Sequence, residues 1–158
     1  MFERFARETL ATVRRASEIA ETEGAAVVQS EHLLLALVDP ARDPVGRALV
    51  EAGIDADRIN AARNREFRSA LASAGVDTER GGPSPPSRLR RGRTTRFAPS
   101  ANLALERTLL ATVDEGARRI SNRHLLVAIT SAEVGTTPAL LAELGIEADE
   151  LRQLVGND

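Results

Sequence analysis

The sequence predicts an all-α fold of two tandem four-helix repeats, eight helices in total, packed about a pseudo-twofold axis. The first observation is a duplication, because residues 5–64 align on residues 97–156 without a gap and give 16 identities in 60 pairs. The second is periodicity, since apolar residues recur at steps of three and four and no segment alternates with a period of two. The third is composition, because 42% hydrophobic residues in a chain of 158 suffice for one packed core.

The duplication is clearest around the two histidines of the chain. Ser-Glu-His-Leu-Leu-Leu-Ala-Leu at 30–37 returns as Asn-Arg-His-Leu-Leu-Val-Ala-Ile at 122–129. Each half carries a Leu-rich face that it cannot bury alone, so we expect the halves to pack on each other. The chain is therefore predicted to form one domain over 1–158, with repeat one at 1–74, a linker at 75–96 and repeat two at 97–158.

Repeat one is expected to hold helices at 2–23, from Ser30 to the Asp39-Pro40 pair, at 44–52 and at 55–72. Ser30 is the expected N-cap of the second helix, because its hydroxyl can accept a hydrogen bond from an unpaired backbone N–H. The residue before a proline disfavours the helical conformation, which ends that helix. The apolar face of the first helix comprises Phe2, Phe5, Thr9, Val13, Ala16 and Ala20. The apolar positions of the fourth are Ile59, Ala62, Phe67 and Leu71.

Repeat two is expected to follow the same plan, with helices at 99–115, from Asn122 onward, at 138–143 and at 147–155. Gly116 ends the first of these, and Asn122 is the expected N-cap at the position that matches Ser30. The apolar positions of the first helix are Leu103, Leu105, Leu109, Leu110 and Val113.

The segment at 75–96 differs in composition from both repeats. It is rich in proline, glycine and serine, and carries arginines at 80, 88, 90, 91, 93 and 96. Because it has almost nothing apolar to bury, we interpret it as a flexible basic linker. A nucleic-acid patch is an alternative, although no aromatic residues are interleaved for base stacking and the net charge of the chain is −2, so we expect no nucleic-acid partner.

Composition excludes several kinds of chemistry. There is no cysteine, and all 21 basic residues are arginine, so disulfides, thiolate nucleophiles and Schiff-base lysines are absent. Two histidines make an incomplete zinc site, and neither stands in a nucleophile–base arrangement, so we expect no enzyme, no metal and no cofactor. No apolar run approaches the roughly 20 residues of a membrane span, and the N-terminus has no secretory pattern. We therefore expect a cytoplasmic protein without a membrane partner.

Three features together resemble a known family, the Clp N-terminal domain. They are the opening Met1-Phe2-Glu3-Arg4-Phe5, the two His-Leu-Leu motifs, and Leu-x-x-x-Gly-Ile after the third helix of each repeat. The similarity is to the double Clp-N repeat, also called the Clp R domain, that opens the ClpA and ClpC unfoldases, and the opening pentapeptide is most similar to the ClpC branch. It covers nearly the whole chain outside the linker. No Gly-x-x-x-x-Gly-Lys-Ser/Thr motif is present, so this chain carries no AAA+ phosphate loop, and we expect a stand-alone Clp-N protein.

The resemblance implies a non-enzymatic module that binds proteins or peptides in the ClpC–ClpP proteolysis pathway. Its implied partners are a ClpC-type unfoldase, its adaptors or substrates, and cyclic peptides, and it would act as an adaptor, a regulator or a decoy. One alternative is a small-molecule or peptide sequestering protein that is independent of the protease. Another is a nucleic-acid-associated factor that uses the arginine-rich linker, and the linker is also a candidate bait or modification site for Clp machinery.

The resemblance also implies a site for phosphorylated arginine at the start of the second helix of each repeat. The family carries a Glu before each repeat histidine and a Thr after the opening Phe of each repeat. Here Glu31 matches, whereas Arg123 replaces the second Glu, and Ala6 and Ala98 stand where the Thr hydroxyls would be. Glu31 is also explained as a first-turn carboxylate that favours the helix dipole, and Arg123 as a holder of an anion near the helix start.

A second site implied by the resemblance is the groove between the first helices of the two repeats, where cyclic peptides bind ClpC-type domains. The matching residues are Phe2, Val13, Phe97, Asn102 and Glu106. An apolar floor with a polar edge suits a peptide ligand. Burial of Phe2 and Phe97 in the core between the repeats is the alternative explanation.

Overall fold

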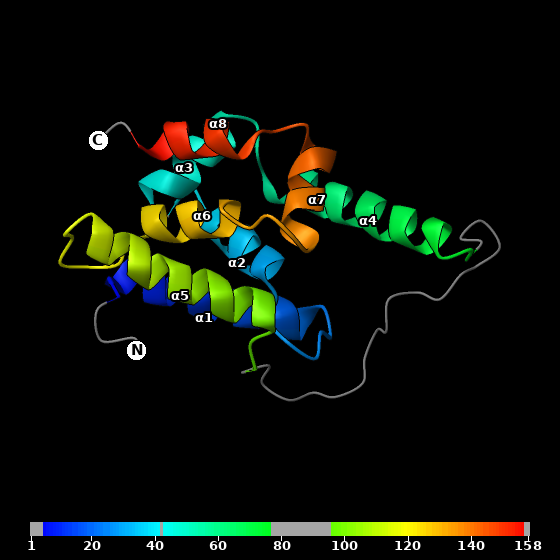
Figure 1. The fold of residues 1–158 in the computed structure, drawn as a ribbon, viewed down its shortest axis with the longest axis horizontal. Helices are drawn as coiled ribbons and strands as arrows, with labels where there is room; N and C mark the ends of the chain where they lie inside the picture. The colour runs from blue at the N-terminus through cyan, green and yellow to red at the C-terminus, as the bar shows by residue number, and fades with distance from the viewer. Residues whose placement is uncertain (1–4, 42, 77–95, 157–158) are drawn as a thin grey trace.

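The computed structural model describes residues 5–41, 43–76 and 96–156, and within these ranges the chain forms eight α-helices and no strand. The helices are α1 (Arg7–Thr22), α2 (Ser30–Leu37), α3 (Pro44–Glu51), α4 (Ala56–Ser73), α5 (Pro99–Asp114), α6 (Asn122–Thr130), α7 (Thr136–Leu144) and α8 (Ala148–Val155). Figure 1 shows α2 and α6 in the middle of the molecule, with α1 and α5 below them in this view. The predicted all-α fold of two four-helix repeats is confirmed.

The repeats are interlocked by matching contacts. Phe5 forms a parallel bridge with Ile120, and Val28 forms one with Phe97. The two bridges are equivalent, because the offset of 92 positions aligns Phe5 with Phe97 and Val28 with Ile120. The fourth helix of each repeat packs on the third helix of the other, as α4 does on α7 and α8 on α3 (Figure 1). The halves therefore share one core about a pseudo-twofold axis.

The starts of α2 and α6 make a second pair of matching contacts. Ser30 Oγ lies 2.8 Å from Thr137 Oγ1 at the start of α7. Asn122 Nδ2 donates to Asp43 Oδ2 at the start of α3. Each central helix is thus tied at its first residue to the third helix of the other repeat, which fixes the geometry of the sites described below.

The core is built around the Leu-rich helices. The side chains that are fully buried on α2 and α6 are Leu33, Leu34, Leu37, Leu125, Leu126 and Ile129. Burying one such side chain contributes roughly 1.5–3 kcal/mol relative to exposing it. Their close packing between the repeats explains why aliphatic side chains build the core of a chain with only 3% aromatic residues.

Three predicted helix starts are wrong. The first helix begins at Arg7 rather than at residue 2, because Phe5 is held in an extended bridge and Ala6 is the N-cap. Ser30 and Asn122 are the first helical residues of α2 and α6, not their N-caps. Their side chains instead cross to the other repeat, as described above. Residues 1–4, which include Phe2, lie outside the described residues.

The predicted apolar face of α5 is also wrong in part. Leu105 is buried, but Leu103, Leu110 and Val113 are 45%, 64% and 56% exposed. Besides Leu105, the buried face is made of small and β-branched side chains, namely Ala101, Ala104, Thr108 and Thr112. The two threonine hydroxyls donate to the carbonyl four residues earlier, at 2.6 and 2.7 Å, so their burial leaves no donor unpaired.

The predicted linker at 75–96 falls largely on residues 77–95, which lie outside the described residues. At its end, Arg96 is already part of repeat two, since its carbonyl accepts a hydrogen bond from the Val28 N–H at 2.8 Å. The projecting end of α4 leads into this segment, and Phe67 on it is 42% exposed rather than buried. Among the described helices, none is long and apolar enough to cross a membrane.

Candidate functional site

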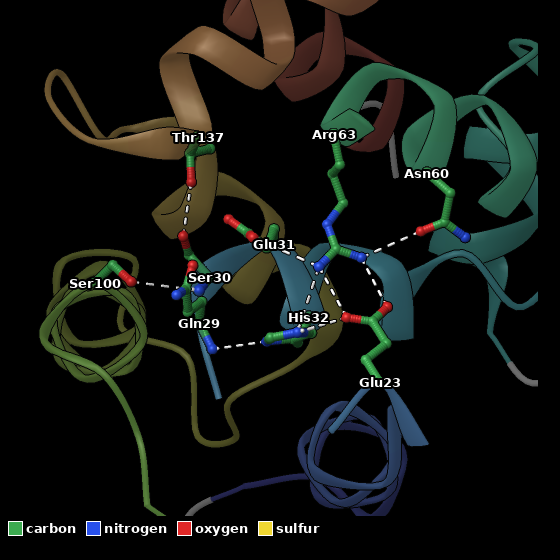
Figure 2. A network of polar contacts seen from close by, with 9 residues as sticks. All are labelled: Glu23, Gln29, Ser30, Glu31, His32, Asn60, Arg63, Ser100 and Thr137. Carbon is green, nitrogen blue, oxygen red and sulfur yellow. Dashed lines mark hydrogen bonds and ion pairs between the residues drawn. The ribbon is translucent and has the colours of Figure 1, made fainter. Parts of the chain in front are cut away.

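The start of α2 carries an acidic cluster, and Figure 2 shows the side chain of Arg63 extending into it from α4. Arg63 donates to both carboxylate oxygens of Glu23, at 2.8 and 2.9 Å, and its Nη2 lies 3.5 Å from Glu31 Oε1. His32 Nδ1 accepts from the backbone N–H of Gln29 at 2.8 Å, and its Nε2 lies 3.0 Å from Glu23 Oε2. The carboxylate that the sequence suggested for a ligand, Glu31, thus faces a guanidinium of its own chain.

The electrostatics of this cluster keep Glu23 and Arg63 ionised. Burial alone would raise the pKa of Glu23, but hydrogen bonds from His32 and Arg63 and the positive charge of Arg63 lower it to about 2. Burial alone would lower the pKa of Arg63, whereas the bonds and charges of Glu23 and Glu31 raise it above its usual value. Since α1, α2 and α4 each contribute a charge, the cluster fastens α4 to the first two helices.

The start of α6 repeats the acid–histidine pair with a different arginine. His124 Nδ1 accepts from the Ser121 N–H at 3.0 Å, and its Nε2 lies 3.2 Å from Glu115 Oε2. Arg123, at the position of Glu31, donates to Glu115 at 2.5 Å from α6 itself. Val155 stands at the position of Arg63, so the fourth helix of this repeat has no guanidinium at the equivalent position.

A pocket of about 430 Å³ opens beside Arg123, between the first turn of α1 and helices α3, α6 and α8. Its lining residues are Glu8, Asp43, Pro44, Val45, Ala48, Ser121, Asn122, Arg123, Leu154 and Val155. Its lining is partly aliphatic and includes the polar side chains of the α6 start. Asn122 is 2% exposed, and its Oδ1 accepts no hydrogen bond within the described residues.

The equivalent positions at the start of α2 carry larger side chains. Leu140, which is 2% exposed, stands where the α6 site has Ala48, and Arg63 stands where the α6 site has Val155. Because Arg63 reaches Glu31, the residue at the position of Arg123, these side chains occupy space that is open at the start of α6.

The residues predicted for the groove between the first helices are placed as follows. Val13 is buried at 7% exposure within the core, and Phe97 is half-buried and packs against the same core. Asn102 Nδ2 donates to the carbonyl of Phe97 at 3.3 Å. The carboxylate of Glu106 is exposed and makes no hydrogen bond within the described residues. The structure therefore brings Phe97 and Asn102 together, whereas Phe2 lies outside the described residues.

Sequence reasoning missed Arg63, Asp43 and the pocket residues of α3 and α8. The sequence does hold a signal for Arg63, because the alignment of the two repeats pairs this arginine with Val155. Both histidines have their ring nitrogens engaged, and no group of three His, Cys, Asp or Glu side chains that could hold a metal occurs in the described part of the chain.

Comparisons with known proteins identify the family and the fold of this chain. The family model of the Clp repeat (R) N-terminal domain matches residues 4–91, whereas a comparison with curated proteins finds no match. Among solved structures, the N-terminal domain of ClpD from Arabidopsis thaliana is similar, with a TM-score of 0.71 and 22% identity over 98% of this chain and 94% of that one. The Hsp104 N-terminal domain from Candida albicans gives a TM-score of 0.64 and 15% identity over 98% and 91%.

The N-terminal domain of the ClpV1 ATPase from the E. coli EAEC Sci1 T6SS is also similar. Its TM-score is 0.60 and its identity is 21%, over 97% of this chain and 84% of that one. At such identities these structures show a shared fold, while the family model covers more than half of the sequence. The chain therefore belongs to the Clp repeat (R) N-terminal domain family.

Proposed function

We propose that this chain is a non-enzymatic module that binds peptides or proteins in a Clp proteolysis pathway of the ClpC–ClpP type. Domains of its family are non-catalytic protein-interaction modules of Clp and Hsp100 chaperones. These 158 residues carry no phosphate-binding loop and no lysine, so the module itself has no ATPase motif. Within the pathway the module acts as an adaptor, a regulator or a decoy.

The observation that carries this proposal is the pocket at the start of α6. Its walls come from both repeats, since α1 and α3 belong to the first and α6 and α8 to the second. It combines an aliphatic wall with a few convergent polar groups, and its volume lies in the range of roughly 300–1,000 Å³ that is usual for ligand sites. The residues Phe97, Asn102 and Glu106 remain a second proposed site, for cyclic peptides.

A pull-down with a purified ClpC-type unfoldase tests the proposal. We expect the chain to retain the unfoldase, one of its adaptors or its substrates, and Ala48→Leu, which fills the pocket, to reduce that retention. Arg68→Gln, an exposed residue on α4, is the control and should bind as the unsubstituted chain does.

If the chain retains peptides but neither contacts nor affects the unfoldase pathway, the alternative of a peptide-sequestering protein is favoured instead. Absence of both kinds of binding would contradict the proposal.

A further inference from the structure

We propose that the pocket at the start of α6 takes a carboxylate carried on an aliphatic chain, with Arg123 as its cationic partner. This inference rests on the peptide-binding function proposed above and names the chemistry of that site. It comes from the comparison of two places that the duplication makes equivalent, the start of α2 and the start of α6.

The starts of α2 and α6 differ in how their arginine is paired with carboxylates. At the start of α2, one guanidinium bridges two carboxylates, since Arg63 contacts both Glu23 and Glu31. At the start of α6, Arg123 contacts the corresponding first carboxylate, Glu115, through its Nη2 alone. A guanidinium has five N–H donors, and within the described residues no second carboxylate engages this one. A ligand carboxylate at Arg123 completes the acid–arginine–acid arrangement.

The two sites also differ in shape. At the start of α2, Leu140 stands at the position of Ala48, and Arg63, at the position of Val155, reaches Glu31. At the start of α6, Ala48 and Val155 line the open pocket together with Val45 and Leu154. The pocket admits an aliphatic side chain, so a leucine or the methylenes of a glutamate would remove apolar surface from water there.

The remaining polar groups are also compatible with a carboxylate ligand. The first backbone N–H groups of α6 lie at the same end as Arg123 and favour an anion, because the helix start carries partial positive charge. Asn122 lines this pocket, and its unpaired Oδ1 lacks a donor such as a peptide N–H supplies. Asp43 does not compete for Arg123, since its two oxygens accept from the Val45 N–H and from Asn122.

Glu8 is the group that opposes an anionic ligand. It lines the pocket and is exposed, and its carboxylate makes no hydrogen bond or ion pair within the described residues. Glu8 lies in the first turn of α1, so the positive end of that helix partly offsets its charge. Removing the charge with Glu8→Gln should therefore strengthen binding of a carboxylate ligand about two- to fivefold, as expected for one exposed charge.

The carboxylate can come from a glutamate side chain or from the C-terminus of a peptide, and three peptides separate these sources. Fluorescence anisotropy with the full chain would compare a labelled peptide that ends in a free leucine carboxylate and has no acidic residue, the same peptide amidated, and an amidated peptide with an internal glutamate. We expect one or both carboxylate peptides to bind at least about tenfold more tightly than the neutral one, as one charge-assisted hydrogen bond provides.

Variants locate the binding. Arg123→Gln should remove most of the preference for the carboxylate, and Ala48→Leu should weaken the same peptide about tenfold or more by filling the space. Arg118→Gln, an exposed arginine in the loop before α6, is the matched control and should change nothing. If Ala48→Leu is unstable, Val155→Met provides a second test, because it fills the same pocket from α8.

Equal binding of all three peptides, or a carboxylate preference that survives both Arg123→Gln and Ala48→Leu, would overturn the inference about this pocket while leaving peptide binding in place. Binding of none of the three peptides would overturn it as well, and retention of the unfoldase would then show that the broader function stands.

Discussion

The start of α2 and the start of α6 carry the same acid–histidine pair, yet one site is closed and the other open. In repeat one Arg63 arrives from α4, ties Glu23 to Glu31 and fills the space beside them. In repeat two the arginine is part of α6, and Val155 leaves a pocket of about 430 Å³. The same duplicated unit thus contributes to stability in one copy and leaves room for a ligand in the other.

The largest expected effect tests whether the two repeats share one core. Leu33→Ala and Leu125→Ala delete equivalent, fully buried side chains, so each should lower the free energy of unfolding by about 2–5 kcal/mol. Because the helices of the two repeats interlock, urea unfolding followed by circular dichroism should stay a single transition in both variants. A separate, earlier transition for one repeat would show that the halves are independent bodies.

The next effect sharpens the contrast between the two arginines. Arg63→Gln leaves Glu23 and Glu31 without their shared cation and should lower the free energy of unfolding by roughly 1–2 kcal/mol. Arg123→Gln breaks a pair whose side chains are 36% and 40% exposed, so its cost should be below about 0.5 kcal/mol. Equal losses in denaturant unfolding would refute the assignment of a structural role to one arginine and a binding role to the other.

The dependence of stability on pH separates the two sites further. The pKa of Glu23 falls from 4.5 to about 2 on folding, so its contribution to stability is present above pH 4.5 and is lost as the pH falls toward 2. The difference in urea midpoint between the unsubstituted chain and Glu23→Gln should therefore shrink over this range. A difference that stays constant down to pH 2 would argue against the ion pair as its cause. Glu115→Gln provides the comparison in repeat two.

The smallest effect concerns α1 and α5. Leu110 is 64% exposed, and the equivalent position on α1 is Glu18. Leu110→Glu should therefore change the free energy of unfolding by no more than about 0.5 kcal/mol, whereas Leu105→Ala on the buried face should cost about 2 kcal/mol or more. The reverse order in denaturant unfolding would mean that α5 packs through its leucines after all.

Much of the fold could be predicted because the duplication constrains it twice. The two His-Leu-Leu motifs fix the central helices, and a break predicted in one repeat, such as that at Gly53, has a counterpart at Gly145. The face of α5 could not be predicted from apolar periodicity, since Thr108 and Thr112 satisfy their hydroxyls within the helix and are then buried like apolar residues. The extended conformation of Phe5 depends on its bridge to another repeat, which no local pattern encodes.

The candidate sites were predictable to a smaller extent. Glu31 and Arg123 were identified by position, but the partner of Glu31 depends on long-range geometry, since Arg63 is 32 residues from it. The pocket exists because Ala48 and Val155 are small, and a small residue in a helix gives no sign of what lies opposite it. Only the alignment of one repeat on the other marks these positions as exceptional.

The central claim is that the two equivalent sites differ in access, and a titration followed by amide NMR shifts tests it most directly. Adding the peptide with the free leucine carboxylate should shift, in a saturable manner, the signals of Ala48, Arg123 and Val155, while those of Gln29 and Glu31 stay in place. Shifts confined to the start of α2, or equal shifts at both sites, would contradict the account.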